Sequence, residues 1–200
     1  MSERFADLRK IPRQPAARLL ALANARLQSR LKSPASASVA EVLTELEATE
    51  ALVDMLRLLS VALPGRERAW WACLAARDLL GPLPEKVPPT LTAAENWVRQ
   101  PGEPTRVALR AALDTLESDD DVSLCATSAL FADGTLGPGE LSHHPAPPGA
   151  SETAAFGINV MALGTRSRDF TAEATRLIDR ALNIARGGNG RPAAGKEGLA

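Results

Sequence analysis

The chain is poor in aromatic and sulfur-containing side chains. Among its 200 residues there is no tyrosine, aromatic residues make up only 4%, and there are two cysteines and two histidines. β-Sandwich cores usually draw on aromatic and β-branched side chains, so this composition argues against that fold class. Alanine, leucine, glutamate and arginine are abundant instead, and all four favour helices. The composition therefore predicts an all-α protein.

The sequence also lacks an excess of either charge and has no long apolar run. The formal net charge is −1 and the sequence pI is near 6.2, so no overall attraction to nucleic acid is expected. No stretch reaches the roughly 18 apolar residues of a membrane span, and the first residues lack an apolar signal core. Cys73 and Cys125 stand far apart in apolar segments, which is typical of buried thiols in a reducing compartment. We expect a cytoplasmic protein that does not insert into membranes.

Proline and glycine clusters divide the chain into segments of helical periodicity. Further helices are expected to open at Ser38 and Thr92, and another to end near Phe131. The periodicity predicts helices over 15–31, 49–63, 66–80, 104–116, 151–163 and 169–186. Helices of this length joined by short turns suit an orthogonal bundle or a solenoid-like stack of about seven to eight helices.

Composition also suggests how the chain is organised. Residues 1–35 form a basic segment with an amphipathic helix, residues 36–186 a single helical domain, and residues 187–200 a disordered tail. Within the domain, residues 132–150 are rich in glycine and proline and predict an irregular loop.

Three positions suggest how individual helices begin. Ser38 with Glu41, and Thr92 with Glu95, have the S/T-x-x-E spacing of a capping box. Ser151 is placed to cap the helix that follows the glycine- and proline-rich loop.

The N-terminal segment carries most of the local charge asymmetry. Only Glu3 and Asp7 oppose eight basic side chains in the first 35 residues. A basic amphipathic helix can bind anionic lipid, nucleic acid or an acidic groove, here through Arg13, Arg18, Arg26 and Arg30. Residues 36–63 are acidic, however, and offer a neighbour within the same chain. We expect the basic helix to pack on its own domain.

No residue set in the sequence completes a catalytic, cofactor or metal site. His143 and His144 are adjacent in the loop and have no cysteine nearby, so they read as a solvated pair. Residues 190–197 approach the spacing of a phosphate-binding loop, but Glu197 stands where Ser or Thr should bind magnesium. The acidic run 119–121 lacks the glycine and closing glutamate of a calcium loop and instead suits a helix N-terminus. The sequence predicts no enzyme.

The least generic part of the chain is a short segment with two adjacent tryptophans. Trp70 and Arg77 fall on one face of its predicted helix, and Trp71 lies about 100° round from Trp70. Such a wide apolar arc predicts a central helix in contact with neighbours on two sides. Trp70 is expected in the core, whereas Trp71 is left open between the core and a contact with a partner. Trp97, on the next helix, is a further structural or interaction anchor.

Residues 62–77, Ala-Leu-Pro-Gly-Arg-Glu-Arg-Ala-Trp-Trp-Ala-Cys-Leu-Ala-Ala-Arg, resemble the signature of a bacterial all-helical family of unknown function. Later blocks follow in the same order: Asn96-Trp97-Val98 with Pro101 and Arg106, then residues 131–138, then residues 180–187. The resemblance covers about 40 to 188, and Phe131 stands where tryptophan is expected. Members of that family are associated with gene neighbourhoods of type VI secretion and forkhead-associated domains, and not with a reaction. The resemblance therefore implies an accessory or adaptor protein.

These observations lead to three hypotheses of function. The first is a non-enzymatic adaptor or accessory protein that binds a protein partner, a component or cargo of a type VI secretion apparatus. The second is an enzyme or small-molecule binder with a pocket near the 132–150 loop and His143 or His144. The third is attachment of the basic N-terminal helix to a membrane surface or nucleic acid. The missing catalytic set and the resemblance favour the first.

Overall fold

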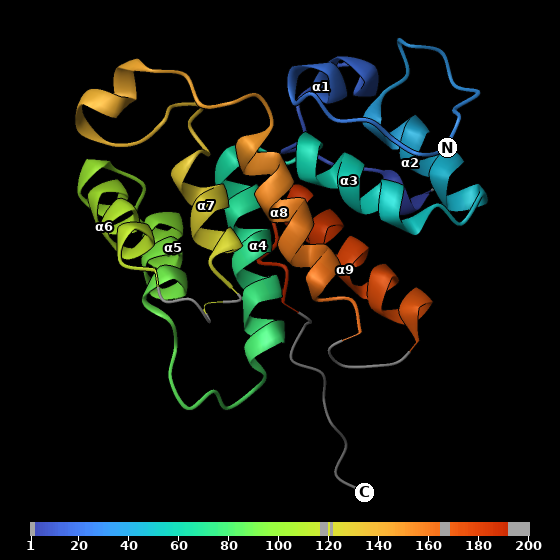
Figure 1. Ribbon diagram of the computed structural model, residues 1–200. Helices are drawn as coiled ribbons and strands as arrows, with labels where there is room; N and C mark the ends of the chain where they lie inside the picture. The colour runs from blue at the N-terminus through green and yellow to red at the C-terminus, as the bar shows by residue number, and fades with distance from the viewer. Residues whose placement is uncertain (1–2, 117–119, 121, 165–168, 192–200) are drawn as a thin grey trace, which may run out of the picture.

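The computed structural model describes residues 3–116, 120, 122–164 and 169–191. Every regular element in these ranges is helical, and the only β pairing is two isolated bridges, Pro15 with Ser38 and Thr135 with Pro145. The described α-helices are α1 (Ala16–Leu22), α2 (Val39–Ala48), α3 (Leu52–Ala62), α4 (Gly65–Leu80), α5 (Pro89–Arg99), α6 (Glu103–Asp114), α7 (Leu124–Leu130), α8 (Ala150–Met161) and α9 (Phe170–Ala185), with 3-10 helices η1 (Glu3–Phe5) and η2 (Gly139–His143) (Figure 1). The predicted all-α class is confirmed.

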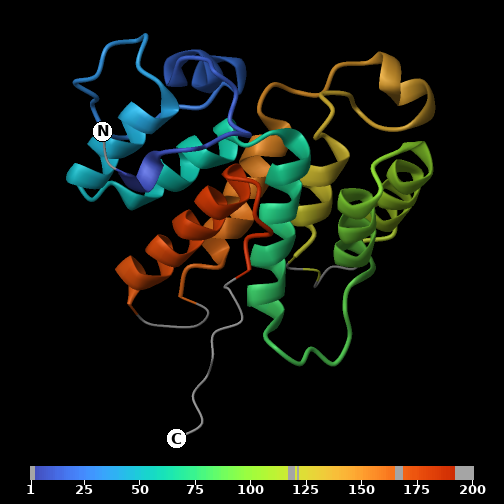
Figure 2. The ribbon, with the colours of Figure 1, turned by 180° about the vertical axis from the view of Figure 1, so that it is seen from behind.

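Helix α4 lies at the centre of the molecule. It packs against α5, α7, α8 and α9, and the two opposite views show it between the other helices (Figures 1 and 2). Ala69, Ala72, Ala75 and Ala76 on this helix are completely buried. Because alanine has a short side chain, neighbouring helices can approach the α4 backbone from several sides. The alanine-rich sequence of this segment is thus explained by its central position.

The remaining helices form two groups on either side of α4. Helices α5, α6 and α7 pack on one another, while α3 contacts α1, α2, α8 and α9 on the other side. Helix α9, the last of the chain, returns to contact α3 and α4 (Figure 2). In a solenoid, each repeat contacts only its neighbours in sequence. These long-range contacts make the fold a bundle rather than a stack.

The N-terminal segment joins the same core as the domain. Phe5, Ala16 and Leu19 are buried in it. Its helix is shorter than predicted, because α1 ends at Leu22 rather than at residue 31. Asn24 takes a left-handed φ of 48°, and backbone N–H groups just beyond it bind an α3 carboxylate instead of continuing the helix.

Two of the three predicted helix starts are wrong. The Ser38–Glu41 capping box is present and opens α2. Helix α5 begins at Pro89, so Thr92 lies inside the helix and its hydroxyl donates to the Pro88 carbonyl. Helix α8 begins after Gly149, which places Ser151 inside the helix.

Segments expected to be irregular make definite contacts. The 132–150 loop contains η2, and its first residue lies against α4: a Cβ at Gly65 would be 2.3 Å from the Ala132 carbonyl oxygen. Glycine at the start of α4 is therefore required by close approach. Residues 187–191 of the predicted tail lie against α4 and α9, whereas residues 192–200 are outside the described ranges. None of the described helices combines the length and apolar content needed to cross a membrane.

Candidate functional site

Trp71 is a core residue. Its side chain is completely buried, and the indole N–H donates to the Leu177 carbonyl of α9 at 3.1 Å. A buried indole needs such a partner for its N–H. Trp71 therefore joins α4 to α9 and cannot contact a partner protein. Trp97 is also buried, with 6% of its surface exposed.

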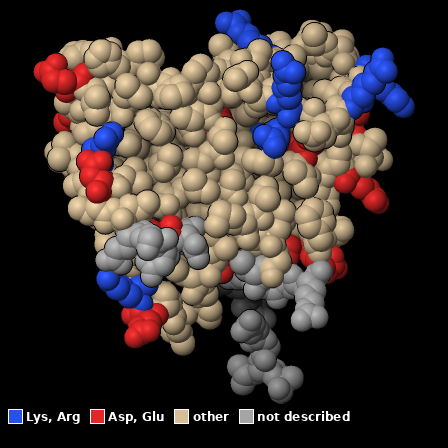
Figure 3. Space-filling model, in the orientation of Figure 1, with Lys and Arg blue, Asp and Glu red and all other residues tan. Residues whose placement is uncertain are grey.

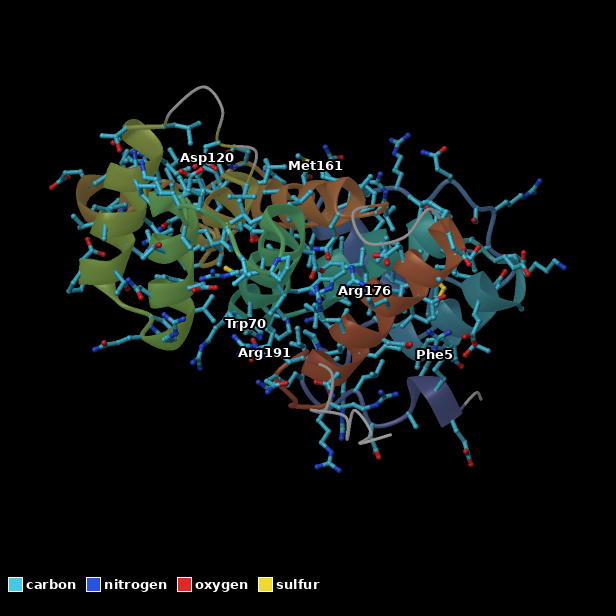
Figure 4. All side chains as sticks on the ribbon, turned by 90° about the horizontal axis from the view of Figure 1, so that it is seen from below. Phe5, Trp70, Asp120, Met161, Arg176 and Arg191 are labelled. Atoms are coloured by element: carbon cyan, nitrogen blue, oxygen red, sulfur yellow. The ribbon has the colours of Figure 1, made fainter. Side chains whose placement is uncertain are left out.

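Trp70 lies at the edge of the core: it packs against the core residues but is less buried than Trp71. It is half-buried, and its indole N–H donates to the Asn189 carbonyl at 2.7 Å. The Arg191 guanidinium lies over its ring, 5.6 Å from the centroid (Figure 4). The difference between the two tryptophans has a simple cause: α4 turns the Trp71 face toward α9 and leaves the Trp70 face to the short segment after α9.

Arg77, on the same helix, is held by a carboxylate of α5. Its Nε and Nη2 donate to the two carboxylate oxygens of Glu95 at 2.8 Å each, and Arg99 adds a bond of 3.1 Å. Burial raises the pKa of Glu95, but the bonds and charge of Arg77, followed by Arg99, outweigh it and leave that pKa below its usual value. Glu95 is thus not the capping residue that its spacing suggested but the link between α4 and α5.

The exposed edge of α4 runs along the floor of a groove. Near Trp70 a cavity of about 370 Å³ is lined by Lys10, Arg66, Glu67, Trp70, Val98, Arg99, Ile184, Gly188, Asn189 and Arg191. A second cavity, of about 520 Å³, is lined by Leu74, Arg77, Asp78, Gly81, Pro82, Pro84, Glu95, Arg99, Arg180 and Arg191. The two cavities adjoin at Arg99 and Arg191, which line both, and together they are here called the α4 groove.

The α4 groove has an apolar floor and a cationic rim. Six of its lining residues are basic and three are acidic: Lys10, Arg66, Arg77, Arg99, Arg180 and Arg191 against Glu67, Asp78 and Glu95. The acids are engaged within the protein. Glu67 pairs with Lys10 at 2.6 Å, and Asp78 with Arg180 at 2.6 Å and with Arg176 at 2.8 Å. The groove is therefore positive where a ligand would meet it.

Arg66 is placed to contact a ligand in this groove. It is exposed at the first turn of α4, and its Nε donates to the Val98 carbonyl near the end of α5 at 2.7 Å. That bond fixes the side chain along the rim while the terminal nitrogens of the guanidinium remain capable of binding a carboxylate. Sequence reasoning missed Arg66 because its role depends on a contact 32 residues away.

Two of the remaining signature residues serve the core. Arg68 is 7% exposed; it donates to the Ser60 and Leu63 carbonyls at the end of α3 and pairs with Glu152 of α8 at 2.7 Å. It thereby satisfies carbonyls that a helix terminus leaves open. Cys73 is fully buried beside Cys125, and the hydrogen bond between the thiols, together with burial, raises the pKa of Cys73 well above its usual value. This thiol is not activated as a nucleophile.

The 132–150 loop does not come together with the tryptophans. His143 and His144 are exposed, and none of the loop residues lines the α4 groove. The loop is held instead by Arg106 of α6, which donates to Thr135 at 2.8 Å and pairs with Asp133 at 2.6 Å. Within the described ranges, no three His, Cys, Asp or Glu side chains gather into a metal-binding group.

The comparisons with known proteins identify a family but no function. Residues 42–185 match the family described as Family of unknown function (DUF6931), and the chain belongs to that family. The match includes α3 to α9 and begins after the basic N-terminal segment. No curated protein and no solved structure matches the chain.

Proposed function

We propose that the protein is a non-enzymatic helical adaptor that binds an acidic segment of a partner protein in the α4 groove. The observation that carries the proposal is the combination of a half-buried tryptophan with a cationic rim in a single groove. Tryptophan and arginine are the residues that contribute most to protein–protein interfaces. The groove lies on the helix that carries the signature segment of the family resemblance.

The contact between Trp70 and Asn189 supports an extended polypeptide as the ligand. The indole N–H already donates to a backbone carbonyl, and Gly190 passes so close that a Cβ there would lie 2.9 Å from a methyl carbon of Leu74. The α4 groove therefore accepts main chain at van der Waals distance. A partner segment would lie beside residues 188–191 and extend toward the Leu74 end of the groove.

The charge of the rim supports an acidic ligand. Arg66, Arg99 and Arg191 are exposed at the groove, and 61% of the Arg99 side-chain surface is accessible even though it contacts Glu95. Carboxylates of a partner would form charge-assisted hydrogen bonds with these guanidinium groups. Such contacts speed association and disfavour basic partners.

The biological setting is proposed from the sequence resemblance. The signature at residues 62–77 resembles a family associated with type VI secretion gene neighbourhoods. We place the adaptor among the accessory components of that apparatus, with a secretion-system protein or a cargo protein as the partner.

The experiment is quantitative co-purification of partners with four forms of the full chain. The wild type is compared with Trp70→Ala, with Arg66→Glu, and with Arg110→Glu as a charge-matched control on α6, away from the groove. A partner that contains an acidic segment should be recovered by the wild type and the control and be reduced about thirtyfold in the two groove variants, the loss expected for an interface anchor. Equal recovery by all four forms would contradict the proposal.

A further inference from the structure

Apart from Arg4, which pairs with Glu47, the basic side chains of the N-terminal segment form no described ion pair with the acids of residues 36–63. The sequence suggested that the acids of residues 36–63 would pair with these cations. Instead, both Asp54 oxygens accept backbone N–H bonds, from Gln28 at 2.9 Å and from Ser29 at 2.7 Å. Glu45 likewise accepts the backbone N–H of Ser33 at 2.9 Å. Asp54 and Glu45 thus hold the backbone of residues 28–33 in place and form no described ion pair with its basic side chains.

Four arginines are left exposed as a result. Arg13, Arg18, Arg26 and Arg30 lie on the surface, and within the described ranges none forms an ion pair or a side-chain hydrogen bond. Lys and Arg side chains stand out over the part of the surface where α1 and the following segment lie (Figure 3). We call these four residues with Leu22 the α1 basic surface.

The α1 basic surface also has an apolar element. Leu22, one turn after Arg18 on α1, is 63% exposed, and Ala17 and Ala21 beside it are exposed as well. The backbone N–H of Ala16 donates to the Ala37 carbonyl at 2.9 Å, so the start of the helix is joined to the end of its return segment. An exposed leucine flanked by unpaired arginines is the arrangement with which interfacial helices contact lipid headgroups and acyl chains.

We propose that the α1 basic surface binds the anionic headgroups of a membrane, with Leu22 inserted among the lipids. The exposed arginines of this segment number four, which is in the range of basic residues that recognise acidic lipid surfaces. Nucleic acid is the other polyanion to weigh, but single strands are bound by stacking on aromatic side chains, and Phe5, the aromatic residue of this segment, is buried. The surface lies apart from the α4 groove, so an adaptor could hold a partner while attached to a membrane.

The test is flotation of the full chain with phosphatidylserine–phosphatidylcholine vesicles, with pure phosphatidylcholine vesicles as reference. The wild type should float with the anionic vesicles only, and less as salt is raised. Arg18→Glu with Arg26→Glu should lower binding by at least about thirtyfold, since each basic residue near such a surface contributes roughly fivefold. Arg110→Glu, the control on α6, should bind like the wild type.

Two further measurements decide between membrane and other anions. Leu22→Ser keeps the charge and should still reduce flotation severalfold, whereas a purely electrostatic contact would leave it unchanged and overturn the insertion. If a low concentration of double-stranded DNA releases the protein from the vesicles, the membrane is overturned as the ligand. No flotation of the wild type would overturn the proposal altogether and leave the α4 groove untouched. Circular dichroism checks that each variant is folded, which is expected because Arg18, Arg26 and Leu22 are exposed and Arg110 pairs with Asp114 at the surface.

Discussion

The indole N–H of Trp70 donates to the backbone carbonyl of Asn189, 119 residues later, at 2.7 Å. This bond places the last described residues of the chain on the wall of the α4 groove. A second bond, from the Gly190 N–H to the Asn183 side chain at 2.8 Å, fixes the same segment to α9. The face of α4 that carries Trp70 is therefore partly covered by the chain itself.

Removal of residues 187–200 should uncover Trp70. We expect the fluorescence of the shortened chain to shift to the red and to be quenched more strongly by acrylamide, because the indole loses its cover. The same deletion made in a Trp70→Phe background should show neither change, since Trp71 and Trp97 stay buried. A shift that persists without Trp70 would mean that the deletion loosens the core instead.

The two tryptophans should differ sharply in their effect on stability. Trp71→Ala should lower the free energy of unfolding by about 3–5 kcal/mol, as large-to-small substitutions in a core do. Trp70→Ala should lower it by about 1 kcal/mol, because the ring is only half-buried. Urea denaturation followed by circular dichroism measures both. Similar losses for the two variants would show that Trp70 belongs to the core as Trp71 does.

The buried Arg68 should be essential for packing α3 against α8. Arg68→Met removes the donors for the Ser60 and Leu63 carbonyls and leaves Glu152 without its cation. We expect a loss of about 3–5 kcal/mol in the free energy of unfolding, the range for breaking a buried ion pair. Arg110→Met, which changes a partly exposed arginine on α6, should lose less than about 0.5 kcal/mol in the same denaturation experiment. Equal losses would refute the role given to Arg68.

Stability should fall in acid through the carboxylates that face arginines. Burial raises the pKa of Asp78, yet Arg180 and Arg176 outweigh it and leave that pKa below its usual value, as happens at Glu95. A carboxyl with a lower pKa in the folded state stabilises the fold fully above its unfolded pKa, about 4, and loses that contribution as the pH falls through the folded value. Thermal melting at several pH values should show this decline.

The variant Asp78→Asn isolates this effect. It should be less stable than the wild type at pH 7 by about 3 kcal/mol, since Arg180 loses its buried partner, and should lose less stability on acidification. Asp114→Asn, which removes an exposed partner of Arg110, serves as the control and should follow the wild-type curve. If Asp78→Asn keeps the full acid dependence, other groups cause it.

How far the sequence predicts this structure depends on the range of the interactions. The Ser38–Glu41 box and the start of α9 at Asp169 were predictable, because side chain and backbone lie within one turn. The same spacing at Thr92 and Glu95 misled, since a proline opens α5 earlier and Arg77 of another helix holds the carboxylate.

The candidate site was only partly predictable for the same reason. The segment with two tryptophans could be recognised, but which indole faces solvent depends on the course of α9 and of residues 187–191 across α4. Arg66 and Arg191 enter the site through contacts with Val98 and Trp70, far along the chain. Local patterns carry no information about such pairs.

The buried thiols should behave as core residues. Cys73 and Cys125 are fully buried, so neither should react with Ellman's reagent in the native protein. Both should react together once denaturant unfolds the chain. Ser142→Cys, which adds a thiol in the exposed η2 region, provides the positive control. Rapid reaction of a native thiol would contradict the packing of α4 against α7.

The α4 groove is the central claim, and site-specific photo-crosslinking tests it most directly. A photoreactive amino acid replaces Arg99 at the rim of the groove or, as the control, Arg110 on α6, in otherwise unchanged full-length protein expressed in its native cells. Mass spectrometry of the adducts should identify a partner joined through an acidic segment from position 99 and not from position 110, and Trp70→Ala should abolish that adduct. The same adducts from both positions, or an adduct at position 99 that survives Trp70→Ala, would contradict binding in the groove.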